Sequence, residues 1–314
     1  MIAEEIYRVR APAKVNLVLR VGPLRPDGYH ELSTLMVPLD LADRVEVRLA
    51  RGRRGGVACR VPGRPELDGP SNLAARAAEA FRSRFAATDR LAIAIEKHIP
   101  VTAGLGGGSS DAAAVIRALA RAYGVRDRAA LAEVALEVGS DVPFFLGQGP
   151  AWAKGRGERL RPVAVPPLDL VLVYPTDPAM AIRAGDAYRW LDAARRGDGA
   201  ARGWAAQASW RLSLLANDLE EPCFGRHPGL RDLAAHLVGQ GARAAIMSGS
   251  GPTVFGIFED RAAARRCARV VEEGKGQSVE VHVVRTLERQ PGVLRWKSPR
   301  SASSPSPRKS SRRT

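Results

Sequence analysis

A glycine-rich run at residues 100–114, PVTAGLGGGSSDAAA, constrains the fold of this 314-residue chain more than any other feature of its sequence. Glycine has no Cβ, so the backbone of such a run can adopt left-handed angles and approach a bulky ligand closely. Apolar residues at helical spacing follow the run and predict a helix over residues 110–123, capped by Ser109 and Ser110. The first N–H groups of that helix have no backbone partner and attract anions. The run therefore predicts a phosphate-binding loop.

Two common phosphate-binding signatures do not fit this loop. The chain contains no Gly-Lys-Ser or Gly-Lys-Thr ending, and Ser109 occupies the position at which the dinucleotide fingerprint requires glycine. A flexible glycine turn without a ligand is the alternative for an isolated loop of this kind. The choice between a phosphate-binding loop and a flexible turn therefore depends on the other segments of the chain.

The N-terminal segment, residues 11–21, alternates in the manner of a half-buried strand. This pattern puts Lys14 and Asn16 together on one face and apolar residues on the other. A lone lysine on a strand is usually a solvated surface residue, so a catalytic Lys14 needs support from neighbouring motifs.

A polar turn at residues 25–32, RPDGYHEL, ends in Tyr29 and His30. An aromatic ring beside an imidazole suits a nucleobase, which is bound by stacking and hydrogen bonding. The alternative is an ordinary surface turn, since Pro-Asp-Gly is a common turn sequence.

Two later segments add further candidate groups. Residues 138–146, VGSDVPFFL, put Asp141 among apolar residues, where it is either a helix cap or a general base. Residues 245–258 contain a second small-residue loop, with Ser250 and Gly251, that suits close approach by a phosphate.

Taken in this order, the segments resemble the GHMP kinase superfamily, which includes galactokinase and the homoserine, mevalonate and phosphomevalonate kinases. The strand APAKVNL, the loop GLGGGSS and the loop SGSG are similar to its three motifs. The runs AKVNL, RPDGYH, EKHIP and GSDVP resemble the branch that phosphorylates a cytidine diphosphate-linked methylerythritol. The resemblance covers residues 8–287 and rests on the combination, since no single motif is specific.

The resemblance implies transfer of the γ-phosphoryl group of ATP, with Mg²⁺, to the 2-hydroxyl of that acceptor in the non-mevalonate route to isoprenoids. It makes Asp141 the general base and Lys14 the cation that keeps Asp141 ionised and polarises the hydroxyl. It makes Tyr29 the stacking platform for cytosine and His30 the group that hydrogen-bonds the base edge. Phosphoryl transfer depends mostly on positioning and charge neutralisation, so the loop and the ion should carry the largest share of catalysis.

The expected site has three groups of residues and no metal-ligating cluster. The catalytic pair is Lys14 and Asp141, and the substrate-binding residues are Asn16, Tyr29, His30, Ser250 and Gly251. The ATP-binding residues are Asn72, Lys97, Pro100, Val101, Thr102, Ala103, Gly104, Leu105, Gly106, Gly107, Gly108, Ser109 and Ser110. Asn72 and Lys97 match positions on the adenine side, although Asn72 is equally a candidate cap for a helix over residues 73–85.

One segment departs from the pattern of the related enzymes. They have a Ser/Thr-rich stretch after the proline of a strand and then an aromatic residue, whereas residues 175–188 read PTDPAMAIRAGDAY. Ala181 and Gly185 supply neither a hydroxyl nor a ring. Tyr188 or a shifted loop would then have to supply these groups on the far side of the base.

Composition fits a cytoplasmic small-molecule enzyme. The three cysteines match no disulfide framework or zinc spacing, Glu4 and Glu5 are wrong for a signal peptide, and no apolar run approaches a membrane span. The formal net charge is +15, but eight Lys and Arg residues and no acid lie from residue 289 onward. This tail predicts disorder, and it is either a weak polyanion contact or without function. The remaining positive charge suits a site for a triphosphate and a diphosphate.

The order of the expected elements predicts an α+β fold, because strands and helices do not alternate strictly. Further helices are expected over residues 129–138, 185–195 and 227–238, and strands over 44–50, 91–96, 168–174, 244–247, 254–258 and 279–284. The resemblance implies the two-domain GHMP kinase fold. Residues 1–155 would form an ATP-binding domain like domain 2 of ribosomal protein S5, residues 156–288 a ferredoxin-like domain, and residues 289–314 the disordered basic tail.

Two rival functions stay open at this point. One is another GHMP kinase, of the homoserine or mevalonate type, and the other is a basic nucleic-acid-binding protein that has kept the fold without catalysis. The Tyr29–His30 pair and the lone Asp141 favour the cytidyl acceptor. The expected partner is therefore a small molecule rather than nucleic acid or a membrane, and the chain is expected to be a monomer or a homodimer.

Overall fold

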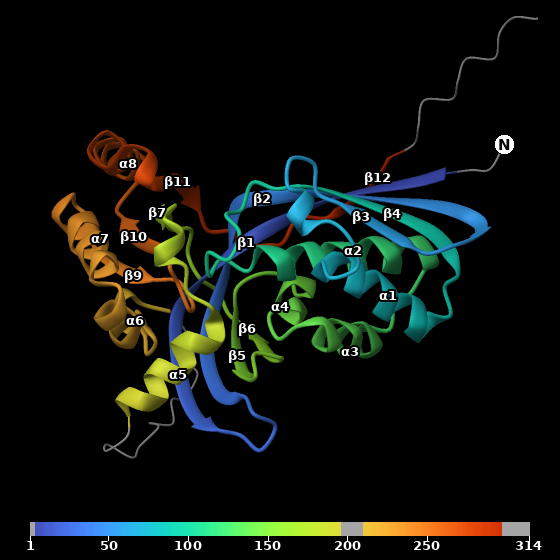
Figure 1. Cartoon of the computed structure of the whole chain (residues 1–314), viewed down its shortest axis with the longest axis horizontal. Coiled ribbons are helices and arrows are strands. Elements are labelled where there is room, and N and C mark those ends of the chain that lie inside the picture. Colours follow the sequence, from blue (N-terminus) through green and yellow to red (C-terminus); the bar gives the residue numbers. More distant parts are fainter. Residues whose placement is uncertain (1–3, 196–209, 297–314) are drawn as a thin grey trace, which may run out of the picture.

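The computed structural model describes residues 4–195 and 210–296, which form two β-sheets, each covered by helices (Figure 1). Within these residues the first sheet has eight strands and the second has four. Strands and helices follow one another without a regular repeat, so the predicted α+β class is confirmed.

The first sheet has the order β12-β1-β2-β4-β3, and β5, β6 and β8 extend it. Helices α1 to α4 lie on one side of it (Figure 1). The strands are β1 (Glu4–Leu24), β2 (His30–Arg54), β3 (Val57–Arg60), β4 (Asp89–Glu96), β5 (Ala151–Gly155), β6 (Arg159–Pro162), β8 (Ala216–Asn217) and β12 (Val293–Trp296). The helices are α1 (Leu73–Phe85), α2 (Gly107–Tyr123), α3 (Arg128–Val138) and α4 (Val142–Leu146).

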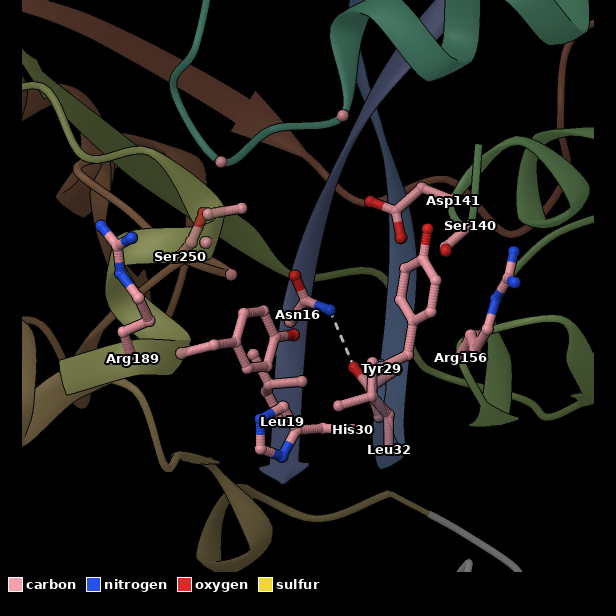
Figure 2. Close-up of a pocket in the computed structure, with 18 of the residues that line it drawn as sticks. Asn16, Leu19, Tyr29, His30, Leu32, Ser140, Asp141, Arg156, Arg189 and Ser250 are labelled. Atoms are coloured by element: carbon pink, nitrogen blue, oxygen red, sulfur yellow. Dashed lines mark hydrogen bonds between the residues drawn. The ribbon is translucent and has the colours of Figure 1, made fainter. Parts of the chain in front are cut away.

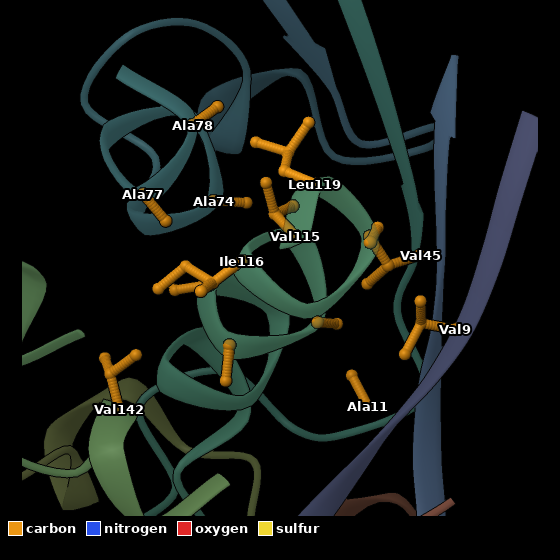
Figure 3. Packing of buried hydrophobic residues seen from close by; sticks show 14 of the residues in the cluster. Val9, Ala11, Val45, Ala74, Ala77, Ala78, Val115, Ile116, Leu119 and Val142 are labelled. Atoms are coloured by element: carbon orange, nitrogen blue, oxygen red, sulfur yellow. The ribbon is translucent and has the colours of Figure 1, made fainter. Parts of the chain in front are cut away.

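The core of this half lies between the sheet and α2 (Figure 3). Val9, Ala11 and Val45 point from the strands toward the helix, which presents Val115 and Leu119. On the other side of α2, α1 contributes buried alanines, whose small side chains let the two helices pack closely. This packing fixes α2, whose first turn lies within the glycine-rich run.

Helix α2 begins at Gly107, with Gly106 at the N-cap position. Ser109 and Ser110 lie inside its first turn, so the prediction that they cap the helix was wrong. The left-handed region is occupied by Gly104 (φ 75°) and Gly106 (φ 71°). The other two glycines of the loop have helical angles, which is why the helix starts earlier than apolar spacing predicts.

The second sheet has the antiparallel order β11-β7-β10-β9. Numbered in chain order these strands run 4-1-3-2, with helices between the first and second strands and between the third and fourth, which is the predicted ferredoxin-like arrangement. The strands are β7 (Asp169–Pro175), β9 (Ala244–Met247), β10 (Val254–Phe258) and β11 (Val279–Arg285). The helices are α5 (Ala184–Ala194), α6 (Glu220–Arg226), α7 (Pro228–Gly239) and α8 (Arg261–Lys275). Short 3-10 helices lie at Pro65–Leu67, Pro178–Met180, Leu212–Leu214 and Gly276–Ser278.

The long strands β1 and β2 connect the two halves. Leu19 and Val21 of β1 belong to the apolar core of the second half, and a separate cluster combines Val15 with Phe255 of β10. The prediction that β1 is half-buried was wrong, because the second half packs on its apolar face while the glycine-rich loop and the start of α4 cover the face that carries Lys14 and Asn16. Lys14 and Asn16 are each only 4% exposed.

Two of the predicted domain limits do not coincide with the limits of the sheets. The division into domains itself stays a prediction. The boundary at residue 155 falls inside the β5–β6 hairpin of the first sheet. The disorder predicted from residue 289 onward was wrong for residues 289–296, because β12 pairs with β1 and Arg117 donates a hydrogen bond to the carbonyl of Pro291. Residues 297–314 lie outside the described residues.

The three cysteines are buried, and their thiols are free. Over residues 4–195 and 210–296, no helix is long and apolar enough to cross a membrane.

Strand β12 adds four residue pairs to the edge of β1, so a chain ending at Glu288 should be less stable than one ending at Trp296. Each cross-strand pair contributes roughly 0.2–1 kcal/mol, and we expect the free energy of unfolding to fall by about 1–4 kcal/mol. Urea denaturation of the two truncated chains, followed by circular dichroism, measures the difference. Equal midpoints would show that β12 does not stabilise the sheet.

Candidate active site

Two cavities meet at the glycine-rich loop. The inter-sheet pocket, about 550 Å³, is lined by β1, β2 and the start of α4 from the first half and by α5 and the loop after β9 from the second. The loop pocket, about 370 Å³, lies between the glycine-rich loop and the N-terminus of α1. Gly104 and Gly106 line both cavities, so a group at these glycines is accessible from either side.

Lys14 lies where the two pockets meet. Its Nζ donates hydrogen bonds to Asn16 Oδ1 (2.7 Å) and to the Gly104 carbonyl (2.9 Å), and it lies 3.7 Å from Asp141 Oδ2. Burial lowers the pKa of Lys14, and the neighbouring Asp141 carboxylate acts in the opposite direction. Three oxygen atoms therefore surround one ammonium group, which brings together the predicted catalytic pair.

Asn16 is held from its other side by a residue that sequence analysis missed. Asn16 Nδ2 donates to Thr34 Oγ1 (2.7 Å, dashed in Figure 2), and Thr34 Oγ1 donates to the carbonyl of Val18 (2.6 Å). The amide oxygen of Asn16 is thereby fixed toward Lys14. Thr34 lies on β2, and only the pairing register of β1 with β2 could have identified it.

Asp141 stands at the N-cap position of α4, but its side chain makes no capping hydrogen bond within the described residues. Its carboxylate is 38% exposed and projects into the inter-sheet pocket (Figure 2). Of the two interpretations from sequence, a helix cap or a general base, the first does not fit, and the second stays a prediction.

The other end of the inter-sheet pocket is aromatic. Tyr29 is 47% exposed, and the guanidinium of Arg156 lies 4.2 Å from the centre of its ring (Figure 2). A cation over one face of a tyrosine holds the ring in place. Arg156 was not among the predicted site residues.

His30 is buried at the same end and stacks on Tyr188, with ring centres 5.3 Å apart and planes 13° apart. Its Nδ1 lies 3.1 Å from the Gly22 carbonyl and its Nε2 lies 3.3 Å from Asp192 Oδ2. In the segment that departs from the family pattern, Tyr188 lines the pocket together with Ala184 and Gly185. Asp192, on the next turn of α5, was not predicted.

The second small-residue loop meets the first one backbone to backbone. A Cβ on Gly104 would come within 2.3 Å of the Ser248 carbonyl, so this contact requires glycine. Ser250 lines the inter-sheet pocket, whereas Gly251 lies behind the lining and packs against Gly104.

The loop pocket is lined by most of the predicted ATP-binding residues. Leu105 and Ser110 are the exceptions, since both are buried beneath the lining. The lining includes Asn72, Lys97, Pro100, Val101, Thr102, Ala103, Gly104, Gly106, Gly107, Gly108 and Ser109. Asn72 also caps α1, because its Oδ1 accepts a hydrogen bond from the Ala74 N–H (2.9 Å).

Lys97 lies between two buried carboxylates that sequence analysis missed. Its Nζ donates to Asp43 and to Asp111 Oδ2 (2.9 Å). Burial lowers the pKa of Lys97, but the two carboxylates outweigh it and the net shift is upward. Burial raises the pKa of Asp111 to about 8, against the opposing effect of Lys97. Asp111 directly follows the Ser-Ser pair of the motif, which could have identified it. Asp43 lies on β2, in a segment whose own sequence does not indicate a site residue.

Two family models match this chain. The model for the GHMP kinases N terminal domain matches residues 72–149, and the model for the GHMP kinases C terminal domain matches residues 190–276. The first match contains the glycine-rich loop, Lys97 and Asp141. The second contains Asp192 and the loop with Ser250.

Named proteins give a finer comparison. A 4-diphosphocytidyl-2-C-methyl-D-erythritol kinase from Anaeromyxobacter dehalogenans is 67% identical, covering 97% of this chain and 98% of that protein. A crystal structure of 4-(cytidine 5'-diphospho)-2C-methyl-D-erythritol kinase superposes with a TM-score of 0.69 at 36% identity, covering 89% of this chain and 98% of that one. A homoserine kinase from Cytophaga hutchinsonii has a TM-score of 0.68 at 19% identity, covering 93% and 97%, and shows the shared fold alone. The chain thus belongs to the 4-diphosphocytidyl-2-C-methyl-D-erythritol kinase family of the GHMP kinases.

Proposed function

We propose that this chain transfers the γ-phosphoryl group of ATP to the 2-hydroxyl of 4-diphosphocytidyl-2-C-methyl-D-erythritol. The observation that carries the proposal is the pair of cavities that share Gly104 and Gly106, with Lys14 and Asp141 on the inter-sheet side of the shared glycines. ATP in the loop pocket would present its γ-phosphate there, and the acceptor in the inter-sheet pocket would present its hydroxyl.

The chemical step needs one base and one cation beside the hydroxyl. Asp141 takes the hydroxyl proton, the hydroxyl oxygen forms a bond to the γ-phosphorus, and the bond to the β–γ bridging oxygen breaks to release ADP. Lys14 keeps the carboxylate ionised and in position, since its ammonium is already held by Asn16 and Gly104. The proton ends on Asp141 and the phosphoryl group on the acceptor.

The glycine-rich loop and α2 serve the nucleotide phosphates. The backbone of Gly104 and Gly106 allows close approach, and the N-terminus of α2 attracts negative charge. Asp111 lines the loop pocket, and its Oδ1 has no hydrogen-bond partner within the described residues, so this oxygen would hold a Mg²⁺ ion beside the nucleotide phosphates. Bound there, the ion would neutralise charge on the transferring group.

The aromatic end of the inter-sheet pocket suits the base of the acceptor. Tyr29 offers one exposed face for stacking, and Arg156 supports the other side of the ring. Homoserine and mevalonate carry no base that could use this surface. The pocket therefore favours the cytidyl acceptor over those of the rival kinases.

Asp141→Asn should keep ATP affinity and lower kcat by about 10²- to 10⁴-fold, the usual effect of losing a general base. ATP analogue binding by calorimetry and turnover in a coupled ADP-release assay measure the two quantities. Ser140→Ala is the matched control, because Ser140 lines the same pocket without a carboxylate. A turnover near that of the wild type in Asp141→Asn would remove Asp141 from the mechanism.

Gly106→Ala should weaken binding of an ATP analogue by roughly tenfold, since a side chain in the left-handed region costs about 1–2 kcal/mol. The added Cβ would also come within 3.0 Å of Lys14 Cγ. Gly108→Ala is the control, because Gly108 is helical and its Cβ would meet only the end of Leu73, at 3.3 Å. If calorimetry gives both variants the same affinity, the left-handed turn at Gly106 is not needed for nucleotide binding.

Acceptor choice tests the assignment directly. The wild type should phosphorylate the cytidyl acceptor and use homoserine and mevalonate very poorly in the ADP-release assay, because a site built to pair with a base rejects ligands that leave its groups unpaired. Tyr29→Ala should cost roughly 1–3 kcal/mol of acceptor binding, read as KM, with ATP affinity unchanged, and Tyr29→Phe should keep the stacking. Efficient use of mevalonate or homoserine by the wild type would contradict the proposal.

A further inference from the structure

The second small-residue loop, residues 248–251, packs against the group of atoms that holds Lys14. Gly249 of this loop lines the inter-sheet pocket. A Cβ on Gly249 would come within 3.2 Å of Lys14 Nζ and of Asn16 Oδ1. It would come equally close to the Gly104 carbonyl. A shift of the loop would therefore change the surroundings of the Lys14 ammonium.

Asn217 lies outside this loop and holds it by hydrogen bonds. Its Nδ2 donates to the carbonyls of Met247 (2.8 Å) and Gly249 (2.7 Å), and its Oδ1 accepts from the Leu219 N–H (2.9 Å). A carbonyl can only accept and a backbone N–H can only donate, so the three contacts together require an amide in this one orientation. Asn217 is buried and lines neither pocket, so it acts on the loop and not on a ligand.

Asn217 is attached to the same strand that carries Lys14. Strand β8 pairs in parallel with β1 and puts Asn217 beside Leu19. The next residue, Asp218, donates its N–H to the Leu19 carbonyl (2.9 Å), and its carboxylate accepts from the Val21 N–H (2.9 Å). Strand β1 thus carries Lys14 directly and, through Asn217, fixes the loop that packs on Lys14.

We propose that Asn217 is a positioning residue for phosphoryl transfer, an inference that rests on the function proposed above. By holding the Gly249 carbonyl, its amide keeps the loop against Lys14, which in turn keeps Asp141 aligned with the acceptor hydroxyl. A displacement of about 1 Å can lower the rate roughly 10²-fold. The effect of Asn217 should appear in kcat, because the described residues that line the loop pocket include none of residues 248–251.

The first variant is Asn217→Asp, which keeps the size of the side chain and the acceptor for Leu219 but removes both N–H donors. We expect kcat for the cytidyl acceptor to fall about 10- to 100-fold and KM for ATP to stay within about threefold. The rate is expressed per site that binds an ATP analogue in calorimetry, so unfolded protein is not counted. Asn217→Ala, which adds no charge, should show the same split.

Asp218→Asn is the matched control. The Asp218 carboxylate lies in the same junction but contacts β1 and Arg195 and not the loop. This variant should lower stability and keep kcat per binding site within about twofold of the wild type.

A double-mutant cycle with Lys14→Ala separates positioning from general damage. If Asn217 acts through Lys14, Asn217→Ala should change kcat little in a chain that already lacks the ammonium, because the two losses are then not additive. The residual rates of the single and double variants are measured with labelled ATP.

Three results would overturn the inference. The first is a kcat per binding site within about twofold of the wild type in both Asn217 variants. The second is the same fold loss with and without Lys14, and the third is an equal loss in Asp218→Asn. Failure of the proposed function is distinguishable, because the wild type itself would then not phosphorylate the cytidyl acceptor, and this inference would fall with it.

Discussion

The buried ammonium of Lys14 is the interaction on which the site depends. It joins β1 to the glycine-rich loop through the Gly104 carbonyl and to the start of α4 through Asp141. A charge with so little access to water is tolerated only when it is surrounded by acceptors, and Asn16 completes that set. Three separate segments of the chain are therefore held at one point by a single cation.

The contact between the two small-residue loops defines the boundary between the cavities. Gly104 touches the backbone of Ser248 and Gly251, which leaves no room for a side chain at this point. The loop pocket and the inter-sheet pocket therefore share the backbone of Gly104 and Gly106 as common lining. This shared lining lets two ligands with bulky phosphate groups meet while the rest of each lies against its own residues.

Local motifs predicted the residues whose signal lies within a few consecutive positions. Lys14, Asp141 and the glycine-rich loop belong to this group, as do the helices and strands with clear apolar spacing. Thr34 and Asp43 could not be predicted, because they reach the site through strand register and sheet packing rather than through a pattern in their own segments. The same cause explains the error on β1, since alternation cannot reveal that the glycine-rich loop and the start of α4 cover its polar face.

The β1–β2 ribbon carries Lys14 near one end of the inter-sheet pocket and His30 near the other. Its side chains also belong to the apolar clusters of both halves, so the two ends cannot separate by a simple hinge motion. The span between them is accordingly fixed by one hydrogen-bonded ribbon. Acceptor length is then itself a criterion of selection: a molecule whose hydroxyl and base are spaced differently can occupy one end of this pocket but not both.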